Sequence, residues 1–245
     1  MRFADIGLSD ELLRALSEAG YDEPTPIQAA AIPQVQMMRD IIAIAQTGTG
    51  KTASFVLPMI DVLANGRARA RMPRSLILEP TRELAAQVAE NFETYAKHTK
   101  LTKALLIGGV SFGDQDKLID RGVDVLIATP GRLLDHFERG KLLLTGVQIM
   151  VVDEADRMLD PGFQVDVRNV VKRLPAKRQV ALFSATFPQS VERLVAALTR
   201  NPARVSVAPR AAPVRGVEQF VRFVEHPEKR AALLVNLSGS DIEGY

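Results

Sequence analysis

A glycine-rich segment early in the chain carries residue types that hold phosphate groups. Residues 46–52 read Gln-Thr-Gly-Thr-Gly-Lys-Thr and follow an apolar run, Ile41–Ala45. Backbone N–H groups of such a turn bind phosphate oxygens, Lys51 adds positive charge, and the Thr52 hydroxyl suits Mg²⁺. A merely flexible turn is the alternative, disfavoured because a lysine at a helix start opposes the helix dipole. We therefore predict a phosphate-binding loop formed by Ala45, Gln46, Thr47, Gly48, Thr49, Gly50, Lys51 and Thr52. The strict pattern has glycine where this chain has Ala45.

A second segment carries carboxylates directly after an apolar run. Val147–Val152 is followed by Asp153, Glu154 and Asp156. Parallel sheets bind ligands at the carboxyl ends of their strands, so we expect Asp153 to hold Mg²⁺ and Glu154 to orient or deprotonate the water that attacks the γ-phosphate. The alternative is an acidic helix N-terminus that complements its own dipole. Together with the phosphate loop, the segment indicates a nucleoside triphosphatase.

The pattern of apolar runs predicts the elements that position these residues. Short, nearly all-apolar runs alternate with helical segments, as in parallel strands covered on both faces. We predict a three-layer α/β fold with a mostly parallel sheet. The predicted strands are Ile41–Ala45, Leu76–Leu78, Ala104–Ile107, Val123–Ala128, Val147–Val152, Val180–Phe183 and Val205–Val207. The predicted helices between them include Gly50–Leu63, Arg82–Ala96, Phe163–Leu174 and Gln189–Leu198.

Two helices are predicted before the first strand. Ser9 precedes a run of leucines at helical spacing that Gly20 ends. Thr25 caps a second helix, Ile27–Gln36, that places Gln28 in its first turn.

Composition limits the classes of protein. The 245 residues are 47% hydrophobic, contain no Cys and carry a net charge of +2, which excludes a disulfide scaffold and makes disorder improbable. The absence of a long apolar run predicts a soluble, cytoplasmic protein without a membrane partner, monomeric by default. Residues 208–216, rich in Ala, Pro and Arg, predict a linker, followed by one strand, Val217–Val224, and one helix, Pro227–Leu237.

Asp153-Glu154-Ala155-Asp156 resembles the motif that names the DEAD-box RNA helicases. Residues 20–28 are similar to that family's adenine-recognition motif, which implies that Gln28 bonds the adenine edge, that Tyr21 stacks on it, and that Thr25 and the upstream aromatic Phe3 belong to the ATP site. The resemblance implies a RecA-like ATP-binding domain over residues 38–207, an adenine-recognition region over 1–37, and the start of a second lobe over 217–245. It also implies ATP and Mg²⁺ as cofactors.

Other motifs stand in the family's order. By resemblance, three elements contact the RNA sugar–phosphate backbone, although each alone fits a turn or helix cap. They consist of Pro80, Thr81, Arg82 and Glu83; Gly108 and Gly109; and Thr129, Pro130, Gly131 and Arg132. Asp156, Ser184, Ala185 and Thr186 resemble the elements that couple hydrolysis to strand separation, although Ser184 alone fits an N-cap.

The sequence departs from the family pattern in three places. Met38 stands where the family usually has glycine, and Pro161 where it often has methionine. No His-Arg-Gly-Arg-type motif occurs, which predicts that this chain binds nucleotide but hydrolyses it poorly. A binding module without turnover and a DNA helicase remain alternatives. Four arginines between Gly66 and Ser75 are predicted to lie in a solvated loop rather than a nucleic-acid patch: Arg67, Arg69, Arg71 and Arg74.

Overall fold

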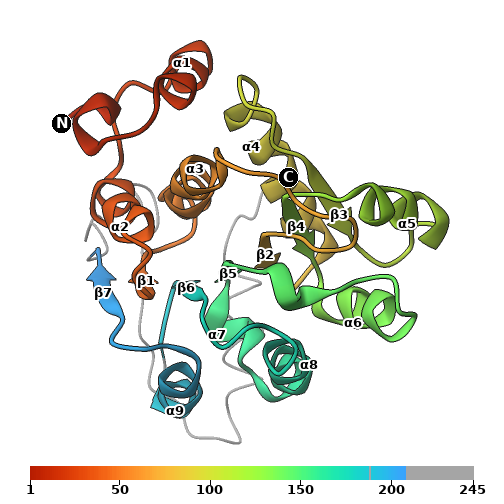
Figure 1. Ribbon diagram of the computed structural model, residues 1–245. Helices are drawn as coiled ribbons and strands as arrows, with labels where there is room; N and C mark the ends of the chain where they lie inside the picture. The colour runs from red at the N-terminus through yellow and green to blue at the C-terminus, as the bar shows by residue number, and fades with distance from the viewer. Residues whose placement is uncertain (188, 208–245) are drawn as a thin grey trace, which may run out of the picture. The chain divides into compact units, whose positions relative to one another are not determined.

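In the part of the chain that the structure describes, the fold is a sheet of seven parallel strands covered by helices. A computed structural model describes residues 1–187 and 189–207, which belong to one compact unit. The strand order is β3-β4-β2-β5-β6-β1-β7 (Figure 1). The strands are β1 (Ile41–Ile44), β2 (Ser75–Leu78), β3 (Lys103–Leu106), β4 (Val125–Ala128), β5 (Ile149–Val152), β6 (Gln179–Ser184) and β7 (Ala203–Ser206). Each overlaps a predicted run, which confirms the α/β class. The predicted strand and helix beyond residue 216 lie outside the described residues.

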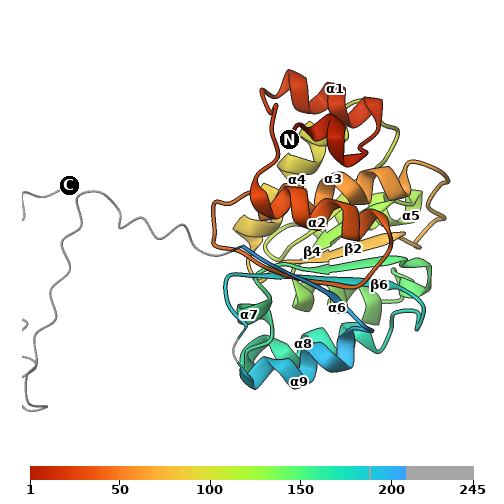
Figure 2. The ribbon, with the colours of Figure 1, turned by 90° about the vertical axis from the view of Figure 1, so that its left-hand side faces the viewer.

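Helices form the two outer layers (Figure 2). One face carries α1 (Asp10–Glu18), α2 (Pro26–Gln36), α3 (Lys51–Leu63) and α4 (Arg82–Tyr95). The other face carries α6 (Pro130–Glu138), α7 (Ala155–Met158), α8 (Pro161–Val171) and α9 (Gln189–Leu198). Helix α5 (Phe112–Arg121) packs at the β3 end of the sheet, and short 3₁₀ turns occupy Phe3–Ile6 and Leu144–Gly146. Within the described residues, no helix combines the length and apolarity needed to cross a lipid bilayer.

Successive residues of each central strand enter opposite cores. In β2, Ile77 belongs to the core under α3, whereas Leu76 and Leu78 belong to the core on the other face. In β5, Val151 and Val152 divide in the same way. This alternation explains why the central strands read as continuous apolar runs, and it decides which way the residue after each strand points.

The two helices predicted before the first strand are confirmed, although α2 begins at Pro26, one residue before the predicted Ile27. Ser9 is the N-cap of α1, and Gly20 follows the helix with a φ of 76°, the left-handed conformation that glycine adopts freely. Thr25 is the N-cap of α2, and its backbone N–H donates to Gln28 Oε1 at 2.9 Å. Gln28 is therefore fixed in the first helical turn, as predicted.

The structure shows the consequence of each local departure from the family pattern. Met38 has a φ of 55°, a left-handed conformation that favours glycine. Pro161 is the first residue of α8, a position that suits proline because its missing N–H would have no helical partner. Helix α8 therefore begins two residues before the predicted start at Phe163.

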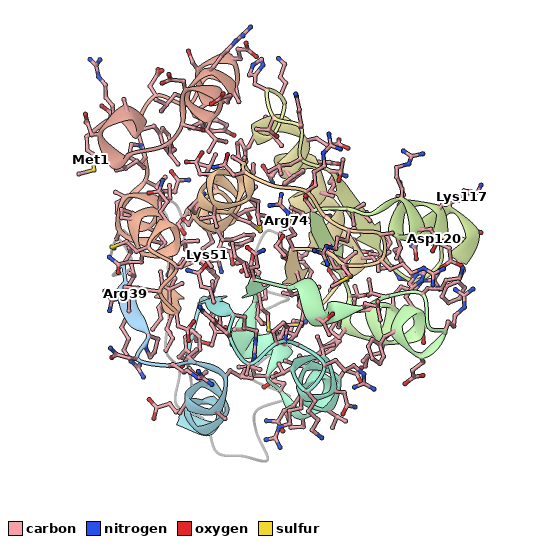
Figure 3. The ribbon with its side chains drawn as sticks, in the orientation of Figure 1. Met1, Arg39, Lys51, Arg74, Lys117 and Asp120 are labelled. Atoms are coloured by element: carbon pink, nitrogen blue, oxygen red, sulfur yellow. The ribbon has the colours of Figure 1, made fainter. Side chains whose placement is uncertain are left out.

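The prediction for the arginine loop is wrong at Arg74. Arg67, Arg69 and Arg71 are exposed as expected, but Arg74 is buried and its guanidinium lies 2.8 Å from Asp124. It also donates to the carbonyl oxygens of Leu63 and Asn65, both at 2.7 Å. In Figure 3, Arg74 lies among the elements of the fold, whereas Lys117 and Asp120 of α5 lie at the outer edge.

Candidate functional site

The phosphate loop forms in the predicted strand–loop–helix context. Residues 45–50 connect β1 to α3, and Lys51 is the first residue of α3 (Figure 3). Gly48 and Gly50 have φ values of 81° and 88°, which explains why glycine stands at both positions. Lys51 is buried, and its Nζ lies 3.3 Å from Glu154 Oε1. The fold thus brings the loop and the acidic segment together across 103 residues of sequence.

The acidic segment turns sharply after β5. Asp153 is buried and its Oδ1 accepts the Glu154 N–H at 2.8 Å. Glu154 has a φ of 47°, a strained conformation that costs about 1 kcal/mol for a non-glycine residue. Burial raises the pKa of Asp153 to about 6. The protein around Asp153 therefore compensates the charge of its carboxylate poorly.

A third carboxyl group, Glu79, lies beside this segment and was missed by the sequence interpretation. It directly follows β2, is fully buried, and neither of its carboxylate oxygens has a hydrogen-bond partner within residues 1–187 and 189–207. Burial, followed by the nearby charges of Asp153 and Glu154, raises its pKa well above the ordinary value. The available signal was a carboxylate at the end of an apolar strand, the same signal that identified Asp153.

The adenine-motif residues lie along α2 and the segment before it. Gln28 is buried and donates from Nε2 to the Gly50 carbonyl at 3.2 Å, which ties α2 to the phosphate loop. Tyr21 is half exposed and packs edge-on against Tyr95. Phe3 lies in the hydrophobic core rather than at the surface. The structure therefore leaves Tyr21 accessible to a ring, while the Gln28 amide has internal partners.

The predicted coupling residues are hydrogen-bonded to one another. Asp156 at the start of α7 donates its N–H to Ser184 Oγ at 3.0 Å. Thr186 donates to Asp156 Oδ2 from its N–H at 3.1 Å and from its hydroxyl at 2.8 Å. Burial acts to raise the pKa of Asp156, but these hydrogen bonds hold it below its ordinary value. Ala185 lies between the two bonded residues, so the acidic segment and the end of β6 are joined.

The three predicted RNA-contacting elements line one open cleft of about 570 Å³. They follow β2, β3 and β4, whose carboxyl ends lie at the same edge of the sheet. A Cβ on Gly108 would come within 3.1 Å of the Arg82 guanidinium, so glycine makes room for that side chain. The lining residues predicted from the sequence are Pro80, Thr81, Arg82, Glu83, Gly108, Thr129, Pro130, Gly131 and Arg132, and Gly109 follows directly in the chain.

Helix α5 supplies supporting contacts to this cleft that the sequence interpretation did not include. Arg132 donates to Gln115 Oε1 at 2.9 Å and stacks over the Phe112 ring. Buried His136 lies 2.7 Å from the same Gln115 oxygen and 3.1 Å from Asp116. Arg132 is therefore held on its inner side by α5, whereas Arg82 is exposed.

Comparisons with known proteins agree on one family. Residues 25–194 match the family model described as DEAD/DEAH box helicase. The chain is 39% identical to the DEAD-box ATP-dependent RNA helicase RhpA of Helicobacter pylori (strain B128), covering 95% of this chain and 46% of that protein. It is 42% identical to the ATP-dependent RNA helicase DeaD of Mycobacterium tuberculosis (strain CDC 1551 / Oshkosh), covering 94% of this chain and 40% of that protein. The chain thus spans less than half the length of either relative.

A solved structure has the same fold. The crystal structure of a DEAD box protein from the hyperthermophile Methanococcus jannaschii matches with a TM-score of 0.80 and 34% sequence identity. The match covers 98% of this chain and 64% of that one. The fold is therefore RecA-like, in agreement with the sequence analysis.

Proposed function

The chain belongs to the DEAD/DEAH box helicase family, and we propose that it forms the ATP-binding and RNA-binding first lobe of an ATP-dependent RNA helicase. In this proposal residues 1–37 recognise adenine, residues 38–207 bind the phosphates and RNA, residues 208–216 link the lobes, and residues 217–245 begin the second lobe. The parent protein couples ATP hydrolysis to RNA duplex unwinding or to remodelling of RNA–protein complexes.

The contact between Lys51 and Glu154 is the observation that carries the proposal. A buried lysine at a helix start and a glutamate in a strained turn lie 3.3 Å apart, next to a loop with two glycines in the left-handed conformation. Incoming phosphates offer Lys51 a stronger partner than Glu154. Glu154 is then released to orient the attacking water.

The residues present also fit Mg²⁺. Asp153 and the Thr52 hydroxyl supply oxygen ligands, and the buried oxygens of Glu79 lack partners among the described residues. In the described part of the chain, no three His, Cys, Asp or Glu side chains converge on one metal position. That sparse set suits Mg²⁺, which keeps several waters and is held by one or two carboxylates plus phosphate oxygens. When bound, Mg²⁺ would neutralise charge on the β- and γ-phosphates.

The shared strand β2 supports coupling between the nucleotide and RNA. Glu79 faces the carboxylates of the nucleotide site, and the next three residues, Pro80, Thr81 and Arg82, line the open cleft. Threonine hydroxyls, glycine N–H groups and an exposed arginine bind sugar and phosphate without reading bases. We therefore expect RNA binding without sequence preference.

The test is RNA-stimulated ATP hydrolysis by the two-lobe parent protein. Glu154→Gln keeps the size of the side chain but removes its basicity, so hydrolysis should fall by about 10²–10⁴-fold while nucleotide binding persists. Glu90→Gln, an exposed carboxylate on α4, is the matched control. Equal rates in wild type and Glu154→Gln would contradict the role of Glu154. Stimulation by DNA as strong as by RNA, at fixed salt, would contradict the choice of RNA.

The isolated chain offers a second readout of the same proposal. It lacks an arginine motif of the His-Arg-Gly-Arg type, and a missing arginine finger lowers turnover by about 10³–10⁵-fold. We expect it to bind ATP and hydrolyse it poorly.

A further inference from the structure

Glu79 and Asp153 are neighbours across two strands. Leu78 pairs with Val152 in the β2–β5 register. The β2–β5 ladder continues one residue further, because the Asp153 N–H bonds the Leu78 carbonyl at 3.2 Å. On the other side of β2, the Glu79 N–H bonds the Ala128 carbonyl of β4 at 3.0 Å, so Glu79 keeps the extended course of the strand. Paired residues of adjacent parallel strands project to the same face of a sheet. Glu79 and Asp153 therefore lie side by side.

The face to which they project is the one that carries the phosphate loop. Ile77 and Val151, two positions earlier in each strand, both enter the core under α3. The alternation places Glu79 and Asp153 on that same side of the sheet, the side covered by α3, whose first residue is Lys51. Lys51, Asp153 and Glu154 are the charged groups that act on Glu79.

Glu79 is not stabilised by the protein around it. Its exposed fraction is 0%, and both carboxylate oxygens lack partners among the described residues. The nearby cation, Lys51, contacts Glu154 instead. Protonation would remove the charge, as the raised pKa indicates, but it would leave a buried hydroxyl and a carbonyl oxygen equally unpaired. No hydrogen bond of its carboxyl group within the described residues therefore gives Glu79 a structural role.

We propose that Glu79 is a positioning residue of the nucleotide site, whose carboxylate accepts hydrogen bonds from water molecules bound to the Mg²⁺ that Asp153 and Thr52 hold. This inference rests on the proposed function. Mg²⁺ retains several waters in protein sites, and each bound water needs an acceptor. The two oxygens of Glu79 provide two acceptors for such waters. Glu79 need not coordinate the metal directly, and among the described residues no three His, Cys, Asp or Glu side chains converge on one metal position.

The test compares nucleotide binding with and without Mg²⁺ in the full 245-residue chain. The dissociation constant of a fluorescent ADP analogue is measured in excess Mg²⁺ and in EDTA, and the ratio gives the Mg²⁺ enhancement. Glu79→Gln should lower that enhancement by about 10-fold, the smaller effect typical of outer-shell partners. Its affinity in EDTA should equal or exceed that of wild type, because a negative charge near the phosphates is removed.

Two further variants serve as an intermediate case and as a control. Glu79→Asp keeps the charge but retracts the carboxylate by one methylene group, so its Mg²⁺ enhancement should lie between those of wild type and Glu79→Gln. Glu90→Gln on the exposed side of α4 should show the wild-type enhancement. Thermal unfolding without nucleotide is measured in parallel, and Glu79→Gln should unfold no earlier than wild type, unlike the loss of a structural contact.

The possible outcomes distinguish failure of the role proposed for Glu79 from failure of the proposed function. A wild-type enhancement in both Glu79 variants would overturn the inference while leaving the proposed function intact. A wild-type chain that binds no nucleotide in either condition would overturn the proposed function itself. Early unfolding of both Glu79 variants with an unchanged enhancement would show a structural residue and contradict the proposal.

Discussion

Buried carboxylates lie at both edges of the sheet, but their hydrogen bonding differs between the two edges. Asp124 precedes β4 and Asp40 precedes β1, so both lie at the amino edge. Asp124 accepts two hydrogen bonds from Thr102 at 3.0 and 3.1 Å, one from the Ala68 N–H at 3.0 Å and one from Arg74 at 2.9 Å. Asp40 accepts the N–H groups of residues 180 and 200 at 2.7 and 2.6 Å.

At the carboxyl edge the corresponding groups are poorly satisfied. Among residues 1–187 and 189–207, Glu79 has no hydrogen-bond partner and Asp153 accepts only the N–H of the next residue, Glu154. All four are buried carboxyl groups, so neither the kind of group nor its burial distinguishes structure from function. The difference is in hydrogen bonding: the amino-edge carboxylates join loops to the sheet, whereas the carboxyl edge retains uncompensated negative charge that a cation can neutralise.

The largest effect that this comparison predicts concerns Asp124. Asp124→Ala leaves Arg74 buried without its anion and frees the Thr102 and Ala68 N–H groups. Loss of one partner of a buried ion pair costs about 3–5 kcal/mol. Urea unfolding of wild type and variant measures this loss in free energy of unfolding.

Asp120→Ala is the matched control for Asp124→Ala. Asp120 also pairs with an arginine, Arg71, at the same distance of 2.8 Å, but these side chains are 41% and 44% exposed, against 9% for each side chain of the Arg74–Asp124 pair. Exposed pairs contribute little, so the variant should unfold nearly as wild type does. Similar losses in free energy of unfolding for the two variants would show that burial and backbone hydrogen bonding do not explain the contribution of Asp124.

The sequence could predict the features that local patterns determine, but not those that depend on contacts between distant residues. The strands and the phosphate loop were predictable because they depend on local patterns, namely apolar runs, glycine spacing and helix caps. Arg74 was not, because its partner Asp124 lies 50 residues away. The isolation of Glu79 depends on the β2–β5 register and on the fact that no donor among the described residues lies within hydrogen-bond distance of its carboxyl group, which no local pattern encodes.

The second prediction concerns the pH dependence of stability without nucleotide. Burial raises the pKa of Asp153 to about 6 and that of Glu79 well above its ordinary value, so the folded state holds these protons more tightly than the unfolded chain. The stability they contribute is complete below about pH 4 and is lost as pH rises through the folded pKa values, at up to about 1.4 kcal/mol per pH unit for each group.

Glu79→Gln isolates one of these two contributions. Between about pH 4 and pH 7, the free energy of unfolding of the variant should fall less steeply with rising pH than that of wild type. Urea unfolding across this range provides the measurement, with Glu90→Gln as the exposed control. Parallel curves for wild type and Glu79→Gln would mean that the carboxyl edge carries no uncompensated charge at this position.

The smallest predicted effect concerns the left-handed backbone of Met38 at the amino edge. It tests whether this strain serves a function. Met37 and Met38 are adjacent, exposed and identical in type, but Met38 has a φ of 55° and Met37 a φ of −72°. Glycine at position 38 relieves the left-handed conformation, so Met38→Gly should gain about 0.5–1 kcal/mol in free energy of unfolding. Met37→Gly adds only backbone freedom to the unfolded chain and should lose a similar amount.

The affinity of these variants for nucleotide shows whether the strain at Met38 contributes to binding. Met38 lies just before Asp40, at the edge opposite the phosphate loop, so both glycine variants should bind the ADP analogue as wild type does. Glu154, at a φ of 47°, is the left-handed residue at the carboxyl edge, where strain accompanies the contact with Lys51. A change in affinity for Met38→Gly would show that the amino edge takes part in binding and would end the division of the sheet into an anchored edge and a ligand edge.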